Sequence, residues 1–204
     1  MAIKPILFNT EMVRAILDGR KTCTRRVAKN VPDHTHRIEP VYENGRFQFD
    51  CFYSSYVAAL DADADFCMPC FPPYQRGDIL YVRETWCKGS WMNETERYYY
   101  KADDNDFHCV WHPSIHMPKD AARIWLKVTD VRVERLQNIN GKGCVKEGIE
   151  EEPLKDVGDE FVKGMYHDLW DSTIKKSDID RYGWDANPWV WVIDFERCDK
   201  PKEE

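Results

Sequence analysis

The sequence lacks any apolar run long enough to cross a membrane, which takes about 20 apolar residues in a helix. Its first ten residues also lack the basic segment and long apolar stretch of a secretory signal peptide. No low-complexity tract, internal repeat or linker interrupts the 204 residues. These absences predict one domain over residues 1–204, located in the cytoplasm and without a membrane partner.

An excess of positive charge is also missing, because the formal net charge is −7. A protein that wraps nucleic acid over its whole surface is therefore not expected. The charges are nevertheless unevenly placed. Residues 14–37 hold seven basic and two acidic residues, whereas residues 147–160 hold seven acidic residues and one basic residue. The basic segment is either a local anion site or a solvated surface loop, and charge alone leaves both interpretations open.

Eight cysteines are present, and without a secretion signal they predict free thiols in a reducing compartment. Cys67 and Cys70 have the CxxC spacing of metal ligands, but a zinc site needs two further ligands. Cys51, His108 or Cys109 could supply them only by folding nearby. We therefore expect no metal and no other cofactor.

Hydrophobic periodicity and turn residues predict several short strands with a few helices around them. Strands are expected at residues 3–8, 37–42, 46–53, 78–84, 97–101, 124–136 (bent near 129–130) and 189–195, and helices at residues 10–18, 137–147 and 159–173. Asn44-Gly45 predicts a hairpin turn. Residues 61–74, 103–106 and 150–158 are expected as turns or loops. The pattern is that of an α+β protein with a small barrel or curled sheet.

The chain contains eight tryptophans, which is an unusually high number for its length. A tryptophan buries a large apolar area, so most of the eight are expected in the core. A tryptophan that remains at a cleft can stack on a flat ligand.

Three stretches carry polar residues at fixed spacing: residues 5–26, which end in Gly-Arg-Lys-Thr-Cys-Thr-Arg-Arg, residues 77–86, which read Gly-Asp-Ile-Leu-Tyr-Val-Arg-Glu-Thr-Trp, and the tail at residues 187–195. Together they resemble the ASCH family. The whole chain is similar to the longer ASCH-like proteins of bacteriophages and prophages, which places it in a bacterial host cell. The resemblance implies a small PUA-like β-barrel, a curled mixed sheet, with surrounding helices. An insertion with a hairpin and loops is expected at about residues 27–75, and a helical segment at about residues 137–175.

The resemblance also implies a polar, basic cleft that accepts RNA or a modified nucleoside. Cations would meet phosphate or base edges, and an aromatic side chain would stack on a base. The residues expected to contact the ligand are Arg20, Thr22, Arg25, Arg26, Arg83 and Trp86.

One branch of compact family members removes the acetyl group from N(4)-acetylcytidine with a lysine, a threonine and a glutamate. The motif places these residues at Lys21, Thr24 and Glu84, so an amidohydrolase is the alternative function. A threonine hydroxyl becomes a nucleophile only when a base takes its proton, which we expect of Lys21. Glu84 would pass the proton to the leaving amine or orient the base. In the simpler interpretation, Lys21 and Arg25 hold a phosphate, Thr24 bonds to the backbone and Glu84 pairs with an arginine.

The hydrolase makes two structural demands. Lys21 and Thr24 can meet only if the segment between them turns, because an extended chain points them to opposite sides. Arg83 and Glu84 also face opposite sides of their strand, so only one of them can point into a given cleft. We expect Glu84 to do so.

Overall fold

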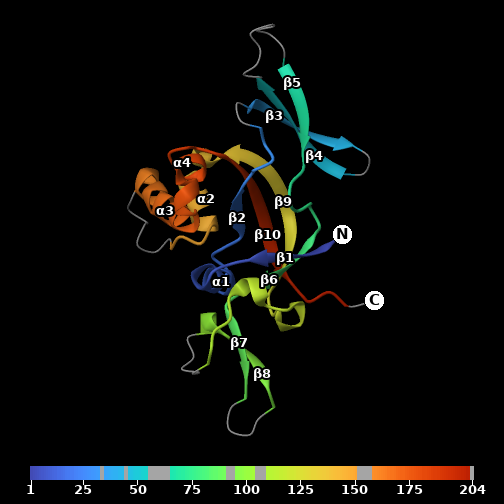
Figure 1. Ribbon diagram of the computed structural model, residues 1–204, viewed down its shortest axis with the longest axis vertical. Helices are drawn as coiled ribbons and strands as arrows, with labels where there is room; N and C mark the ends of the chain where they lie inside the picture. Colours follow the sequence, from blue (N-terminus) through green and yellow to red (C-terminus); the bar gives the residue numbers. More distant parts are fainter. Residues whose placement is uncertain are drawn as a thin grey trace.

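The computed structural model shows a mixed α+β protein with ten strands and four α-helices in its described residues (Figure 1). It describes residues 1–32, 35–43, 46–54, 65–90, 95–103, 109–150 and 158–202. The predicted α+β class is therefore confirmed. Short 3-10 helices lie at Lys101–Asp103, Ser114–His116, Lys119–Ala121, Leu136–Asn138 and Lys176–Asp178.

The centre of the molecule is a curved five-stranded sheet in the order β1-β6-β9-β10-β2 (Figure 1). Its strands are β1 (Ile3–Leu7), β2 (Cys23–Val27), β6 (Ile79–Arg83), β9 (Trp125–Arg135) and β10 (Trp189–Cys198). β1 and β6 are parallel, and the other neighbours are antiparallel. The register between β9 and β10 shifts at Asp194/Phe195, opposite Thr129. This irregularity confirms the predicted bend, because a bulge increases strand twist and curvature.

β1 and β2 are the two edges of this sheet, and in the described residues no ladder joins them. The sheet is thus open and does not form a closed barrel. One side chain crosses between the edges: the Arg26 guanidinium donates from Nη2 to the Leu7 carbonyl oxygen at 2.7 Å. We call the region between the two edges the seam.

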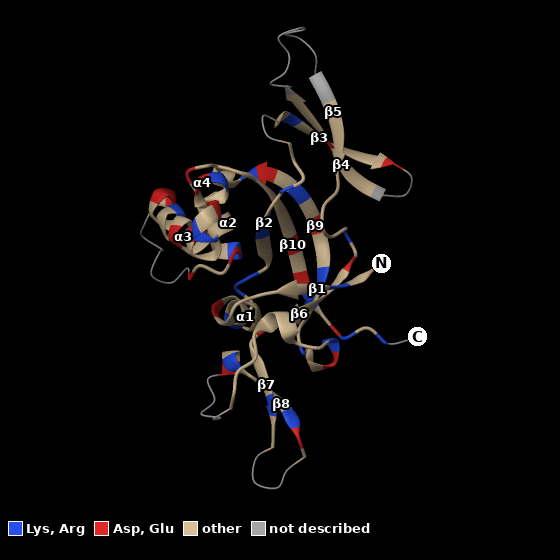
Figure 2. Ribbon diagram, in the orientation of Figure 1, with Lys and Arg blue, Asp and Glu red and all other residues tan. Residues whose placement is uncertain are grey.

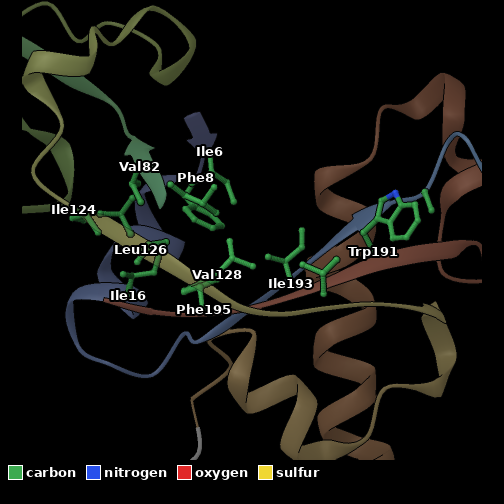
Figure 3. Close-up of a cluster of buried hydrophobic side chains, with 14 of the residues drawn as sticks. Ile6, Phe8, Ile16, Val82, Ile124, Leu126, Val128, Trp191, Ile193 and Phe195 are labelled. Atoms are coloured by element: carbon green, nitrogen blue, oxygen red, sulfur yellow. The ribbon is translucent and has the colours of Figure 1, made fainter. Parts of the chain in front are cut away.

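The inner face of the sheet holds the main hydrophobic core, and α1 (Thr10–Leu17) packs against it (Figure 3). Asn9 caps α1 as predicted, since its side chain accepts from the Met12 amide at 2.8 Å. Gly19, at φ +78°, ends the helix in a backbone conformation that side-chain-bearing residues rarely adopt. The buried members contributed by the strands include Ile6, Leu80, Val82, Leu126, Val128, Trp191, Ile193 and Phe195.

The outer face of β2 and β10 is covered by a helical layer of α2 (Gly141–Lys146), α3 (Asp159–Thr173) and α4 (Ile179–Tyr182). The bounds predicted for α3 are confirmed. α2 is shorter than predicted because Asn140 caps it, accepting from the Gly143 amide at 2.8 Å. Both faces of β10 are therefore buried between Val190 and Ile193, which explains the continuous apolar sequence of that half of the strand.

The chain between β2 and β6 forms a separate three-stranded sheet that projects from the central sheet (Figure 1). Its strands are β3 (Thr35–Glu43), β4 (Arg46–Ser54) and β5 (Asp65–Cys70). The predicted hairpin of β3 and β4 is confirmed, although its turn residues lie outside the described residues. Residues 65–70 were expected within a loop, and this is wrong. Pro69 is tolerated there because β5 is an edge strand of this sheet.

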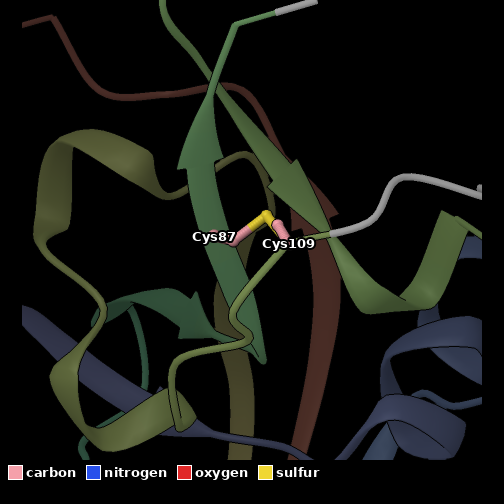
Figure 4. The surroundings of a disulfide bond; sticks show 2 residues. All are labelled: Cys87 and Cys109. Atoms are coloured by element: carbon pink, nitrogen blue, oxygen red, sulfur yellow. A yellow bond between two sulfur atoms is a disulfide. The ribbon is translucent and has the colours of Figure 1, made fainter.

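A second hairpin, β7 (Trp86–Gly89) and β8 (Arg97–Tyr100), projects on the opposite side of the central sheet (Figure 1). Cys87 of β7 forms a disulfide with Cys109, 22 residues along the chain (Figure 4). The expectation that all eight cysteines are free thiols is therefore wrong for these two residues. The amino-acid composition could not predict this disulfide, because the bond forms only if the fold brings the sulfurs of Cys87 and Cys109 close together.

Removing this disulfide is expected to lower the free energy of unfolding by about 3 kcal/mol, because the unfolded chain regains the freedom of the closed loop. Cys87→Ala with Cys109→Ala, compared with the oxidised parent in urea titrations, measures the loss. Cys67→Ala is the control, since that exposed thiol is free. Equal midpoints for the double variant and the parent would contradict this role.

In the described part of the chain, no helix is both long enough and apolar enough to span a membrane. Of the seven tryptophans in the described residues, Trp125, Trp170 and Trp191 are buried, and Trp86, Trp184 and Trp189 are partly buried and pack against the hydrophobic clusters. Trp91 lies outside the described residues.

Candidate functional site

A cavity of about 480 Å³ opens at the seam. Its walls come from the end of β1 and the start of α1, from β2, and from α3. We call it the seam cavity. It is lined by Leu7, Phe8, Asn9, Thr10, Met12, Thr24, Arg25, Arg26, Thr85, Pro113, Ser114, Glu147, Tyr166, Leu169, Trp170, Ser172 and Thr173.

Glu147 lies at the centre of a buried polar network in the cavity wall. Its Oε2 is 2.6 Å from the Lys21 ammonium, and its Oε1 is 3.3 Å from Nη1 of Arg25. The Tyr166 hydroxyl donates to the same Oε1 at 3.4 Å. The Lys21 ammonium also donates to the Glu147 carbonyl oxygen at 2.8 Å. The side chains of Lys21, Arg25 and Glu147 are only 0%, 3% and 4% exposed, so this network is held away from water.

Two backbone features bring Lys21 and Glu147 together. The Lys21 amide donates to the Ala15 carbonyl, and the Thr22 amide donates to the Lys146 carbonyl, each at 2.9 Å. Gly148 has a φ of +106°, and a Cβ there would lie 3.0 Å from the Cβ of Ala15. Only glycine fits both the conformation and the close approach of α1. The turn after α2 thereby aims Glu147 at Lys21.

β2 divides its side chains between the two faces of the sheet. The Arg25 side chain lies on the face that the helical layer covers, and burial there disfavours its positive charge. Burial is the largest single influence, but Glu147 together with the smaller contributions of its other ionisable neighbours outweighs it, so the pKa of Arg25 lies above its ordinary value. Thr24 and Arg26 lie on the other face, with Thr24 buried. Arg26 lies 5.4 Å from the Phe8 ring, and burial lowers its pKa.

Glu84 does not line the seam cavity, although the next residue, Thr85, does. Its carboxylate is fully buried and forms a two-pronged pair with Arg123, at 2.9 Å from Nε and 3.0 Å from Nη2. Burial raises the pKa of Glu84, and Arg123 opposes this effect. Within the described residues, no hydrogen bond or ion pair joins Glu84 to Lys21 or Thr24.

The remaining predicted contact residues lie outside the walls of the seam cavity. Arg20 bonds to the Gly148 carbonyl and to Asp18, and the Thr22 carbonyl accepts from the Phe195 amide. Arg83 donates to the Met117 carbonyl at 2.7 Å. Trp86 packs against Tyr98 and His112. Of the predicted set, the cavity gathers Thr24, Arg25 and Arg26, and the ligand contacts of the others stay predictions.

Most of the cavity lining was not predicted from the sequence, including Glu147, Tyr166 and Trp170. Glu147 was counted only as part of an acidic segment, of which residues 151–157 lie outside the described residues. The available signal was spacing, since Gly141, Cys144 and Glu147 recur every three residues and all three are buried. Similarly, Val162, Tyr166 and Trp170 recur every four residues on the buried face of α3.

The described residues contain no cluster of three or more histidine, cysteine, aspartate or glutamate side chains able to hold a metal. Cys67 and Cys70 lie on β5, and Cys109 is committed to the disulfide. His108 lies outside the described residues. Cys51, on the neighbouring strand β4, is hydrogen-bonded to Cys70 through the two thiols, but in the described part of the chain these cysteines belong to no group of three or more possible ligands.

In comparisons with known proteins, no protein-family model, no curated protein and no solved structure matches this chain.

Proposed function

We propose that this protein is an ASCH-like, PUA-like RNA- or nucleoside-binding protein whose ligand enters the seam cavity. The observation that carries the proposal is the composition of the cavity walls. Aromatic rings from Phe8, Tyr166 and Trp170 share one space of about 480 Å³ with polar groups from Thr24 and Arg26. Ligand cavities are commonly about 300–1,000 Å³, with apolar walls and a few fixed polar groups.

A nucleobase matches these walls because it has flat apolar faces and polar edges. An aromatic wall can stack on the faces, and a hydroxyl and a guanidinium can bond to the edges. Since Lys21 and Arg25 are already paired with Glu147, Arg26 is the cation that we assign to the ligand.

The amidohydrolase alternative requires Lys21, Thr24 and Glu84 to act as one hydrogen-bonded set. In this structure the ammonium of Lys21 pairs with Glu147, and the carboxylate of Glu84 pairs with Arg123. We therefore place binding first and treat hydrolysis as one outcome of the test.

Arg26→Ala is expected to weaken binding of cytidine or a short single-stranded RNA by about 10-fold, the loss of one charge-assisted contact. Isothermal titration at low salt measures the affinities. Arg197→Ala is the matched control, because Arg197 is an exposed arginine of the same sheet outside the cavity walls. No saturable binding of either ligand to the parent protein would overturn the proposal.

Incubation with N(4)-acetylcytidine, followed by chromatography, tests for hydrolysis. Thr24→Val is the sharpest variant because it removes the hydroxyl with little change in volume, whereas Lys21→Ala would also unbalance Glu147. Cytidine released by the parent and not by Thr24→Val would identify a hydrolase. Binding without release would leave a binding protein.

A further inference from the structure

A second cavity, of about 410 Å³, adjoins the seam cavity. Its walls come from β1, from β2 and the residues after it, from β10, and from the segment that links β5 to β6. We call it the Tyr74 cavity. It is lined by Ile6, Leu7, Arg26, Val27, Lys29, Asn30, Phe71, Pro73, Tyr74 and Trp191.

The two cavities follow one another along the seam. They share two wall residues, Leu7 and Arg26. From Leu7, the wall of the seam cavity continues forward to Phe8, and the wall of the Tyr74 cavity continues back to Ile6. The shared residues are the donor and the acceptor of the hydrogen bond that crosses the seam, so the cavities meet at that bond. Figure 2 shows basic residues on β2, the strand that carries Arg26.

Aromatic rings line the Tyr74 cavity, as they line the seam cavity. They belong to Phe71, Tyr74 and Trp191. Trp191 is part of the main hydrophobic core, whereas the Phe71 side chain is 47% exposed. A half-exposed ring in a cavity wall can stack on the flat face of a base, and every base has such a face. The Tyr74 cavity therefore has the walls of a second base site.

The walls of the Tyr74 cavity are held in place by bonds to the central sheet. The Tyr74 hydroxyl donates to the Pro5 carbonyl oxygen at 2.9 Å, and the Lys4 ammonium lies 5.8 Å from the centre of the Tyr74 ring. The Asn30 side chain donates from Nδ2 to the Phe71 carbonyl oxygen at 3.0 Å. These contacts tie residues 71–74 to β1 and to the chain after β2. A wall that is already ordered loses little conformational entropy when a ligand binds.

Arg26 is the cation that both cavities share. Its bond to the Leu7 carbonyl uses one of the five N–H donors of a guanidinium. In the part of the chain that the structure describes, no carboxylate pairs with Arg26. Its remaining donors can therefore bond to the oxygens of a phosphodiester, the group that joins two neighbouring nucleosides in a polynucleotide.

We propose that the ligand of this protein is a single-stranded oligonucleotide that occupies both cavities. One base lies in the seam cavity, the next base lies in the Tyr74 cavity, and the phosphodiester between them lies at Arg26. This inference rests on the proposed function and specifies its ligand. A free nucleoside in the seam cavity would leave an adjoining cavity of similar volume empty. Single-stranded RNA fills both, because its unstacked bases can be splayed onto separate aromatic walls.

The test compares three ligands in isothermal titrations of the full chain at one ionic strength. Cytidine has one base, cytidine monophosphate adds the phosphate, and the dinucleotide CpC adds the second base. The dinucleotide is expected to bind at least about 5-fold more tightly than cytidine monophosphate, the lower end of the effect of one base stacked on an aromatic ring. Equal affinities for these two ligands would overturn the second base site.

A variant of one ring locates the second base. Phe71→Ala is expected to weaken binding of the dinucleotide at least about 5-fold and to change the affinity for cytidine less than about 2-fold. Tyr42→Ala is the matched control, because that ring is 74% exposed and lies outside the walls of both cavities. Equal weakening of dinucleotide binding by the two variants would contradict the Tyr74 cavity as the site.

The same titrations separate the two proposals. If the parent protein binds cytidine but gains nothing from the second nucleotide, the seam cavity remains a nucleoside site and the inference about the Tyr74 cavity fails alone. If the parent protein binds neither cytidine nor the dinucleotide, the proposed function fails, and this inference fails with it.

Discussion

Glu147→Ala is expected to lower the free energy of unfolding by about 3–5 kcal/mol, the usual effect of removing one partner from a buried ion pair. The variant leaves the fully buried Lys21 ammonium without its carboxylate at 2.6 Å. It also removes the nearer carboxylate from Arg25, whose remaining acidic partner is Glu134 at 3.5 Å. Urea titration followed by tryptophan fluorescence measures the loss.

A double variant separates lost charge balance from lost packing. Lys21→Met with Glu147→Leu removes both charges and retains similar volume, so it is expected to recover most of the stability lost in Glu147→Ala. A loss below about 1 kcal/mol in the single variant would contradict the buried network. The measured loss of stability also tests the wall of the candidate site, because Glu147 lines the seam cavity.

Arg123→Ala is expected to cost about 3–5 kcal/mol at pH 8, since it leaves the Glu84 carboxylate buried and unpaired. The same variant removes a guanidinium that lies 4.0 Å from the Tyr100 ring and pairs with Asp103. Unfolding in urea at pH 8, 6.5 and 5 measures the loss and its pH dependence.

The loss should shrink as the pH falls. Burial already raises the pKa of Glu84 above 4.5, and removing Arg123 removes the group that opposes this rise. The folded variant then binds a proton at a pH where the unfolded chain does not. Its stability is therefore greatest below the unfolded pKa and falls as the pH rises through the folded pKa.

A matched arginine on the surface provides the control for this pH trend. Arg37 pairs with Glu39 at 3.2 Å, and both side chains are 51% exposed. Arg37→Ala is expected to change stability by less than about 1 kcal/mol at every pH. A loss in Arg123→Ala that is constant or grows toward acid would show that Glu84 is not the titrating group.

Local elements were predictable from the sequence where a single signal, such as a capping residue or a helix-ending glycine, dominated. Asn9 and Gly19 delimit α1 as expected, and the irregularity in β9 falls at Thr129, within the predicted bend. The prediction failed at β5, where proline suggested a loop but an edge position accommodates it. It also failed at Cys87, because a disulfide depends on the distance between residues far apart in the chain.

The candidate site was only partly predictable, for a related reason. Thr24, Arg25 and Arg26 follow from the motif and line the cavity. The partners of the two ionisable candidates do not follow from local sequence. Lys21 pairs with Glu147, which is 126 residues away in the sequence, and Glu84 pairs with Arg123, which is 39 residues away in the sequence. Such pairings are set by the packing of the helical layer and the loops onto the sheet.

The guanidinium that crosses the seam also has a consequence for solubility. An exposed sheet edge is a template on which a strand from another molecule can pair. Arg26, on edge strand β2, donates a hydrogen bond to the carbonyl oxygen of Leu7 on edge strand β1, and it places a positive charge between the two edges. A single side chain thereby discourages edge-to-edge aggregation at the place where the sheet stays open.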